Sequence, residues 1–315
     1  MAHAFDPEIA AALQAAAAAM GEITPPARGD WASLRANIDG LMAALGTLAP
    51  SFPDVTTTNH TCPAPDGTSL RLRWYEKTGA TPGPAVLYLH GGGMICGNID
   101  IYDPVVAAYV SATGVSMLAA DYRLAPENPH PTPVEDCAAA LQWLLTHAAQ
   151  LGADPTRIAV MGDSAGGGLA AGTALLARDR NLPLARQILI YPMLDDRNLE
   201  PDPALAPFAT WTHDNNFTGW SALLGDLLGT AAVPSSAAPA RAETLTGLAP
   251  AYIEVGELDI FRDESIAYAA RLAQAGIPTE LHVHPGAPHA FERVAPASTV
   301  AQRAMADRLR VLLSL

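Results

Sequence analysis

The sequence predicts an α/β protein built on a mostly parallel sheet, and two observations support this prediction. From residue 85 onwards, short apolar runs alternate with longer helical patterns, which is typical of a parallel sheet with helices on both faces. The second observation is Gly162–Gly166, G-D-S-A-G, which stands between an apolar run and a helix of small residues. A strand, a sharp turn and a helix in this order present the middle serine at the end of the strand.

The composition indicates a folded chain with a large core. Half of the 315 residues are hydrophobic and 16% are charged, so disorder is not expected, and the length allows one large or two ordinary domains. The 18 Lys and Arg residues against 32 Asp and Glu residues give a formal net charge of −14. This charge repels phosphate backbones and anionic membranes, so neither nucleic acid nor a membrane is expected as a partner.

Cysteine usage and the amino terminus both favour a cytoplasmic protein. Cys62, Cys96 and Cys137 are odd in number and far apart, which favours reduced structural thiols over a disulfide framework or a zinc site. The apolar stretch 10–20 is preceded by two acids and no Lys or Arg, unlike a secretory signal. No apolar run reaches the length of a membrane span.

Two helices are expected before the first strand. Asp6-Pro7-Glu8 is a typical helix start, and this helix would run to about Met20. Trp31–Leu45 has apolar residues at helical spacing and predicts a second helix. Both helices lie outside the main sheet, where they would cover a face or a cleft. Simple packing of an amino-terminal segment is the alternative.

The remaining elements follow in a regular order. Strands are expected at 55–60, 69–75, 85–89, 116–120, 158–161, 187–191, 251–255 and 279–284. Helices are expected at 102–113, 134–150, 168–177, 265–275 and 300–315. The alternating polarity of 69–75 predicts a half-buried outer strand, whereas the unbroken apolar run 85–89 predicts a central strand covered on both faces.

Residues 193–247 interrupt this alternation. The stretch is rich in proline, alanine and aromatic residues, with helical pieces expected around 217–228. An insertion at this point would lie above the carboxyl edge of the sheet and could form a lid with the amino-terminal helices. Trp211 and Phe217 are candidate pocket residues, and the alternative is that they form the core of the lid.

A glycine loop, His90-Gly91-Gly92-Gly93, directly follows the central strand. Glycines let backbone N–H groups approach a ligand closely, and ligands of open α/β sheets bind at the carboxyl ends of strands. Such N–H groups, together with the amide of Ala165, would stabilise negative charge on a substrate oxygen. A plain flexible loop is the alternative.

Nucleophilic serine chemistry requires a base and a carboxylate that orients the base. Asp259 lies in the loop after the strand 251–255, and His289 lies in the loop after the strand 279–284. Both follow Ser164 in the chain and would meet it at the same edge of the sheet. Ser164, Asp259 and His289 are therefore predicted as nucleophile, acid and base, in the order of the α/β-hydrolase pattern.

Other carboxylates suit the acid role less well. Glu254 lies within a strand, so its side chain leaves a face of the sheet, and Glu257 could replace Asp259 only if the loop ended early. Asp163, beside the nucleophile, is expected to make structural hydrogen bonds. Asp263 is expected to cap the helix that follows it.

The other histidines near these loops are expected to be structural. His282 and His284 alternate within a strand, which indicates surface or packing positions. His90 is expected to shape the glycine loop through a hydrogen bond.

Taken together, the motifs resemble the hormone-sensitive-lipase-like family of α/β-hydrolase carboxylesterases. The matching segments are H-G-G-G at 90–93, D-Y-R-L-A-P-E at 121–127, G-D-S-A-G-G at 162–167, L-D-I-F-R-D-E at 258–264 and H-A-F at 289–291. They extend from roughly residue 50 to the end of the chain. The resemblance implies an α/β-hydrolase fold with a mostly parallel eight-stranded sheet and helices on both faces. Residues 1–50 and the insertion 193–247 would form a helical cap on a catalytic domain of 51–315.

The resemblance also implies an activity. It indicates a serine esterase that acts on short- to medium-chain esters through an acyl-enzyme, with a small-molecule ester as its partner and with no cofactor or metal. The amides of Gly92, Gly93 and Ala165 would form the oxyanion hole. Members often dimerise through the last strand and helix.

Three positions depart from the residues common in this family. Met94 replaces an aromatic residue, Ile260 a proline, and Ala290 a glycine. Met94 and Ala290 border the expected pocket, so the resemblance does not give the acyl-chain preference. An amidase or arylformamidase, a peptidase, and a non-catalytic small-molecule binding protein of the same fold are the alternative functions.

Overall fold

One eight-stranded sheet forms the centre of the protein. The computed structural model describes residues 3–20 and 24–315 and places the strands in the order β1-β2-β4-β3-β5-β6-β7-β8. β2 is antiparallel to both of its neighbours, β1 and β4. Every other pair of neighbouring strands, from β4-β3 to β7-β8, is parallel. In chain order the strands are β1 Val55–Pro63, β2 Ser69–Lys77, β3 Gly83–Leu89, β4 Ser116–Ala120, β5 Ala153–Asp163, β6 Arg186–Ile190, β7 Ala251–Gly256 and β8 Thr279–His284. The predicted mostly parallel sheet is confirmed.

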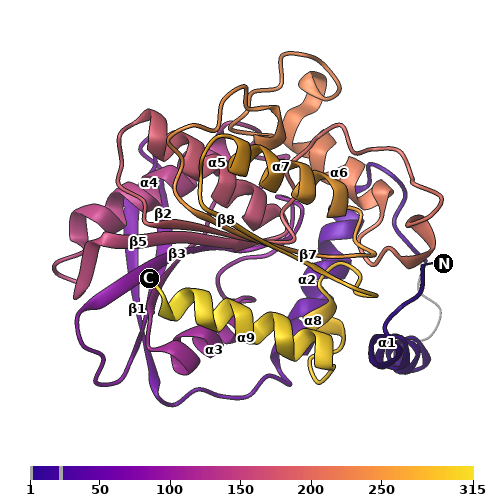
Figure 1. Cartoon of the computed structure of the whole chain (residues 1–315), viewed down its shortest axis with the longest axis horizontal. Helices are drawn as coiled ribbons and strands as arrows, with labels where there is room; N and C mark the ends of the chain where they lie inside the picture. Colours follow the sequence, from indigo (N-terminus) through magenta and orange to yellow (C-terminus); the bar gives the residue numbers. More distant parts are fainter. Residues whose placement is uncertain (1–2, 21–23) are drawn as a thin grey trace.

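Helices cover both faces of the sheet (Figure 1). One face carries α3 Asp103–Thr113 and α9 Thr299–Leu313; the other carries α4 Thr132–His147, α5 Ala165–Asp179 and α7 Arg262–Gln274. Because both faces are covered, the central strands are apolar throughout, and residues 85–89 of β3 are all buried, as the sequence predicts.

The two amino-terminal helices lie outside the sheet, as predicted. α1 Pro7–Met20 begins after Asp6, whose Oδ1 accepts a hydrogen bond from the Glu8 N–H at 2.9 Å. Its Ile9 packs with Phe291 of the short helix α8 Phe291–Val294. α2 Trp31–Gly46 buries Leu34 against the main core and leaves Leu41 and Leu45 partly exposed.

The stretch after β6 forms α6 His213–Leu224 and three short 3₁₀ turns, η1 Ala206–Phe208, η2 Gly225–Leu227 and η3 Pro239–Arg241. Thr212 caps α6 by accepting from the Asn215 N–H, so the helix begins four residues before the expected piece. Glu264 of α7 accepts from the backbone N–H groups of Leu194 and Asp195 and so ties the start of this stretch to α7. Burial raises the pKa of Glu264.

Several element bounds differ from those expected. α5 begins at Ala165, directly after the serine of the G-x-S-x-G motif, and not at residue 168. The prediction that Asp263 caps the helix at 265 is wrong, because α7 already begins at Arg262. Asp263 lies within its first turn and accepts from Arg262 Nε at 2.7 Å.

Among the described residues, no helix is both long and apolar enough to cross a bilayer.

Candidate active site

The turn between β5 and α5 holds Ser164 in a strained conformation. Ser164 has φ +56°, a value that favours glycine, and it is almost buried. A Cβ at Gly162 would lie 2.2 Å from the Gly166 carbonyl oxygen, and a Cβ at Gly166 would lie 2.1 Å from the Leu89 carbonyl oxygen. Both glycines are therefore required for the turn to pack against β3, as the sequence predicts.

Three loops bring Ser164, His289 and Asp259 together. His289 Nε2 lies 2.9 Å from Ser164 Oγ, and His289 Nδ1 lies 2.7 Å from Asp259 Oδ2. Asp259 is fully buried, and its other oxygen accepts from the Phe261 N–H at 2.9 Å. The carboxylate therefore fixes the orientation of the imidazole, which leaves Nε2 facing the hydroxyl.

Two aromatic rings, which sequence reasoning did not single out, flank His289. Tyr191 meets the imidazole edge-on with ring centroids 4.7 Å apart, and Phe261 does so at 5.1 Å. Tyr191 has φ +35° and donates its hydroxyl to Glu292 Oε1 at 2.5 Å. The one sequence signal for Tyr191 is its place at the end of a buried strand, directly before a proline.

The glycine loop after β3 offers unpaired N–H groups. Gly92 and Gly93 have φ +119° and +61°, and a Cβ at Gly92 would lie 2.3 Å from the Cys96 carbonyl oxygen. Within the described chain, the N–H groups of Gly92 and Gly93 donate no hydrogen bond. The Ala165 N–H is the first of α5, a position that has no partner inside its own helix.

Polar side chains behind this loop fix its shape. His90 Nδ1 lies 2.8 Å from the Gly91 carbonyl oxygen, and burial lowers the pKa of His90. Asp163 accepts hydrogen bonds from Tyr88 at 2.8 Å, from Tyr102 at 3.0 Å and from Arg293 at 3.0 Å. Both residues therefore have the structural roles expected from the sequence.

The four candidate pocket residues lie in different surroundings. Trp211 is buried, and its ring would touch a Cβ at Gly93 at 2.8 Å. Met94 and Ala290 follow Gly93 and His289, and both have positive φ. The Phe217 ring lies under the Arg28 guanidinium at 4.1 Å.

The alternative acids and histidines have other partners. Glu254 accepts from Arg308 of α9, and Glu257 accepts from the Gly286 N–H at 2.9 Å. His282 lies 2.7 Å from Glu280, and His284 is buried beside Glu254. None of the four has a hydrogen bond to His289 or Ser164 among the described residues.

The side chains that could ligate a metal and the three thiols have the following surroundings. Within residues 3–20 and 24–315, the one group of three side chains at ligand spacing is Glu280, His282 and Asp307. Arg310 already forms ion pairs with both of these carboxylates. The three cysteines are buried and free, and burial raises the pKa of Cys62 to about 11.

Comparison with known proteins agrees with the fold and with an esterase class. The family model described as an alpha/beta hydrolase fold matches residues 86–293. Esterase LipI of Mycobacterium tuberculosis is 41% identical over 237 residues, which cover 73% of each chain. Ethyl acetate hydrolase of Pseudomonas putida is 35% identical over 247 residues, again 73% of each chain. The solved structure of a bacterial heroin esterase is 39% identical and has a TM-score of 0.90, covering 98% of this chain and 97% of that one.

The eight-stranded sheet and the matching family model thus identify this protein as an α/β-hydrolase. Within that class, the chain belongs to the hormone-sensitive-lipase-like family of carboxylesterases, and it is by class a carboxylic ester hydrolase.

Proposed function

We propose that this protein hydrolyses short- to medium-chain carboxylic esters by a serine mechanism with an acyl-enzyme intermediate. The observation that supports this most directly is the unbroken row of Ser164 Oγ, His289 and Asp259, with successive contacts of 2.9 and 2.7 Å. Nucleophile, base and orienting acid need this arrangement.

In the proposed mechanism, His289 takes the proton from Ser164 as Oγ attacks the ester carbonyl. The new C–O bond displaces the carbonyl electron pair onto oxygen, and the N–H groups of Gly92, Gly93 and Ala165 stabilise that negative charge. Collapse of the intermediate expels the alcohol, which receives the proton from His289. Water then attacks the acyl-serine with the same base and releases the acid.

We also propose that residues 1–50 and 193–247 form a cap over the pocket of a catalytic domain comprising residues 51–315. Support comes from Trp211 and from Gly219 of α6, both of which contact Gly93. Met94, Trp211, Phe217 and Ala290 would form part of the pocket wall. Homodimerisation through β8 and α9, and a cytoplasmic location, complete the proposal.

The first experiment replaces the nucleophile. Ser164→Ala should lower kcat/KM for p-nitrophenyl butyrate by about 10⁴-fold or more, because triad members act as a unit. Ser265→Ala is the matched control, since Ser265 Oγ is buried and has no partner among the described residues. Activity that survives in Ser164→Ala would show that another group is the nucleophile.

The same assay distinguishes an esterase from an amidase. Initial rates across p-nitrophenyl esters from acetate to laurate should peak at short or medium chains, and the matching anilides should react far more slowly. An anilide rate equal to the ester rate would favour the amidase alternative.

A further inference from the structure

An apolar cavity of about 570 Å³ lies on the α3 and α9 face of the sheet, outside the triad. Its walls come from the end of α2, the segment 48–52, α3 and α9, and they include Met42, Phe52, Val105, Ala108 and Met305. None of Ser164, His289, Asp259, Gly92 and Gly93 lines it. The volume is in the range of small-molecule binding sites.

The mouth of the cavity is apolar as well. Leu45 and Leu48 line it and are 43% and 81% exposed, and Leu41 on the same helix is 42% exposed. Exposed leucines grouped at the entrance of an apolar cavity favour entry of an apolar molecule.

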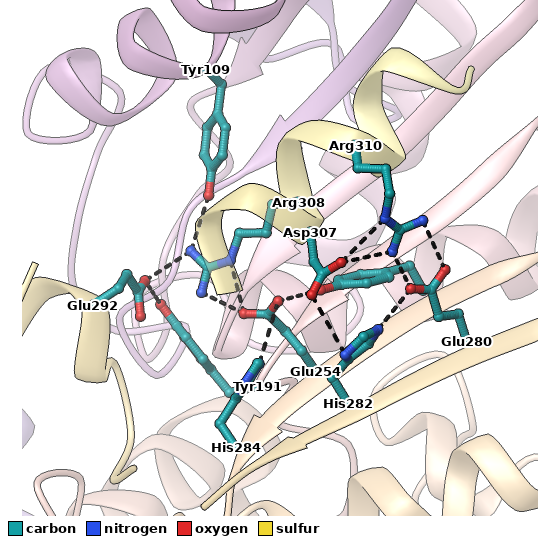
Figure 2. Close-up of polar contacts among 11 residues, drawn as sticks. Tyr109, Tyr191, Glu254, Glu280, His282, His284, Glu292, Asp307, Arg308 and Arg310 are labelled. Atoms are coloured by element: carbon teal, nitrogen blue, oxygen red, sulfur yellow. Dashed lines mark hydrogen bonds and ion pairs between the residues drawn. The ribbon is translucent and has the colours of Figure 1, made fainter. Parts of the chain in front are cut away.

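Charged and phenolic side chains form the floor of the cavity. Figure 2 shows Arg308 between Glu292 and Glu254, with the Tyr109 hydroxyl on the same guanidinium and the Tyr191 hydroxyl on Glu292. Of these residues, all except Glu254 line the cavity.

Asp163 and Arg293 complete this floor. The lining thus contains two carboxylates, Asp163 and Glu292, and two guanidiniums, Arg293 and Arg308. Its formal charges cancel, so neither an anionic nor a cationic ligand is matched by the site.

Two side chains of the cavity floor, Arg293 and Glu292, have hydrogen-bonding groups without a partner among the described residues. Arg293 is 18% exposed and donates to Asp163 Oδ2 and towards Met42 Sδ. A guanidinium has five N–H donors, so three of them lack a partner among the described residues. Glu292 Oε2 is enclosed and has no partner there either. A hydroxyl group would meet both needs, because it accepts from a guanidinium and donates to a carboxylate.

We propose that this cavity is a binding site for a neutral, largely apolar alcohol, with its chain along α3 and α9 and its hydroxyl against Arg293 and Glu292. The site is distinct from the ester pocket. Its floor residue Tyr191 touches the ring of His289, and Asp163 precedes Ser164, so the bound alcohol would lie behind the catalytic residues.

Methionine methyl resonances can locate the ligand. The chain has eight methionines; Met42 and Met305 line the cavity, whereas Met94 and Met193 adjoin the glycine loop and Ser164. Titrating the ¹³C-methyl-methionine protein with 1-decanol should shift the signals of Met42 and Met305 first. Ser164→Ala should bind equally well, whether or not the chain hydrolyses esters. Shifts confined to Met94 and Met193 would place the alcohol in the ester pocket and overturn the proposal.

A cavity-filling variant supplies the second test. Ala108→Trp on α3 should weaken 1-decanol binding at least tenfold, whereas Ala306→Trp, at an exposed position of α9 outside the cavity, should leave it unchanged. Retained ester hydrolysis would show that Ala108→Trp is folded; if it does not fold, Val105→Phe fills the same wall. Decanoate and decylammonium should bind at least tenfold more weakly than 1-decanol. Unchanged binding in the filled variants, or equal binding of either ion, would contradict the proposal.

Discussion

At the scale of single residues, the turn at Ser164 depends on the missing side chains of its glycines. Gly166→Ala would push a methyl group into the carbonyl oxygens of Leu89 and His90, at 2.1 and 2.5 Å. We expect a loss of about 3 kcal/mol in the free energy of unfolding, with lost esterase activity, because both neighbours are buried backbone atoms at the end of β3 and cannot easily move. Urea denaturation and p-nitrophenyl butyrate assays measure the two effects.

Gly40→Ala is the matched control for this variant. Gly40 also lies inside a helix, but a Cβ there meets nothing within 4 Å. It should stabilise the protein by about 0.5–1 kcal/mol, since alanine is the better helix former. A neutral Gly166→Ala would contradict the packing argument.

Most positions of the site could be predicted from sequence, because they lie in short motifs at the ends of strands. Ser164, Asp259 and His289 meet because parallel strands place their carboxyl ends at one edge. Tyr191 and Phe261 could not be recognised in this way, because an aromatic residue that packs against an imidazole has the same sequence pattern as one that fills a core.

At the scale of elements, the side chains of Arg35 and Asp39 attach α2 to the glycine-loop region, and Asp39 does so by accepting from the Gly97 N–H at 2.7 Å. Arg35 donates to the Ile95 carbonyl at 2.5 Å and the Ala125 carbonyl at 2.8 Å, and it pairs with Glu127. Arg35→Met should lower kcat by about tenfold and stability by about 1–3 kcal/mol, because partly buried carbonyls lose their donor. Steady-state kinetics and thermal unfolding test both changes.

Arg303→Met on α9 is the control, since Arg303 is exposed and has no ion pair among the described residues. Equal kinetics in the two variants would show that Arg35 does not support the loop. Sequence periodicity predicted α2 to within a residue, but it could not predict these partners, which lie about 60 and 90 positions further along the chain.

At the scale of the whole molecule, a buried ion pair joins the sheet to the last helix. Burial disfavours the charged form of Glu254, but Arg308 outweighs it and lowers the pKa of Glu254 to about 2. The ion pair therefore adds to the free energy of unfolding above pH 4.5, and this stabilisation is lost as the pH falls towards 2. Glu254→Gln should cost about 3 kcal/mol at pH 7 and make stability less dependent on acid pH.

Urea denaturation from pH 7 to pH 3 tests this expectation against Glu200→Gln, whose side chain is 89% exposed and whose replacement should cost almost nothing. If the free energy of unfolding changed with pH in the same way for Glu254→Gln and for the wild type, the expected role of the ion pair would be contradicted. The fold class was predictable because alternation extends along the whole chain. The ion pair was not predictable from the sequence. No sequence pattern links a glutamate in a strand to an arginine in a helix 54 residues later.

The hydroxyl of Thr210 donates to the backbone carbonyl of His289 at 2.7 Å. Any outward swing of the segment around Thr210 must break this bond or pull the histidine loop with it. If this segment moves as part of the proposed cap, its opening would also shift the imidazole, and the open form would have a misaligned base.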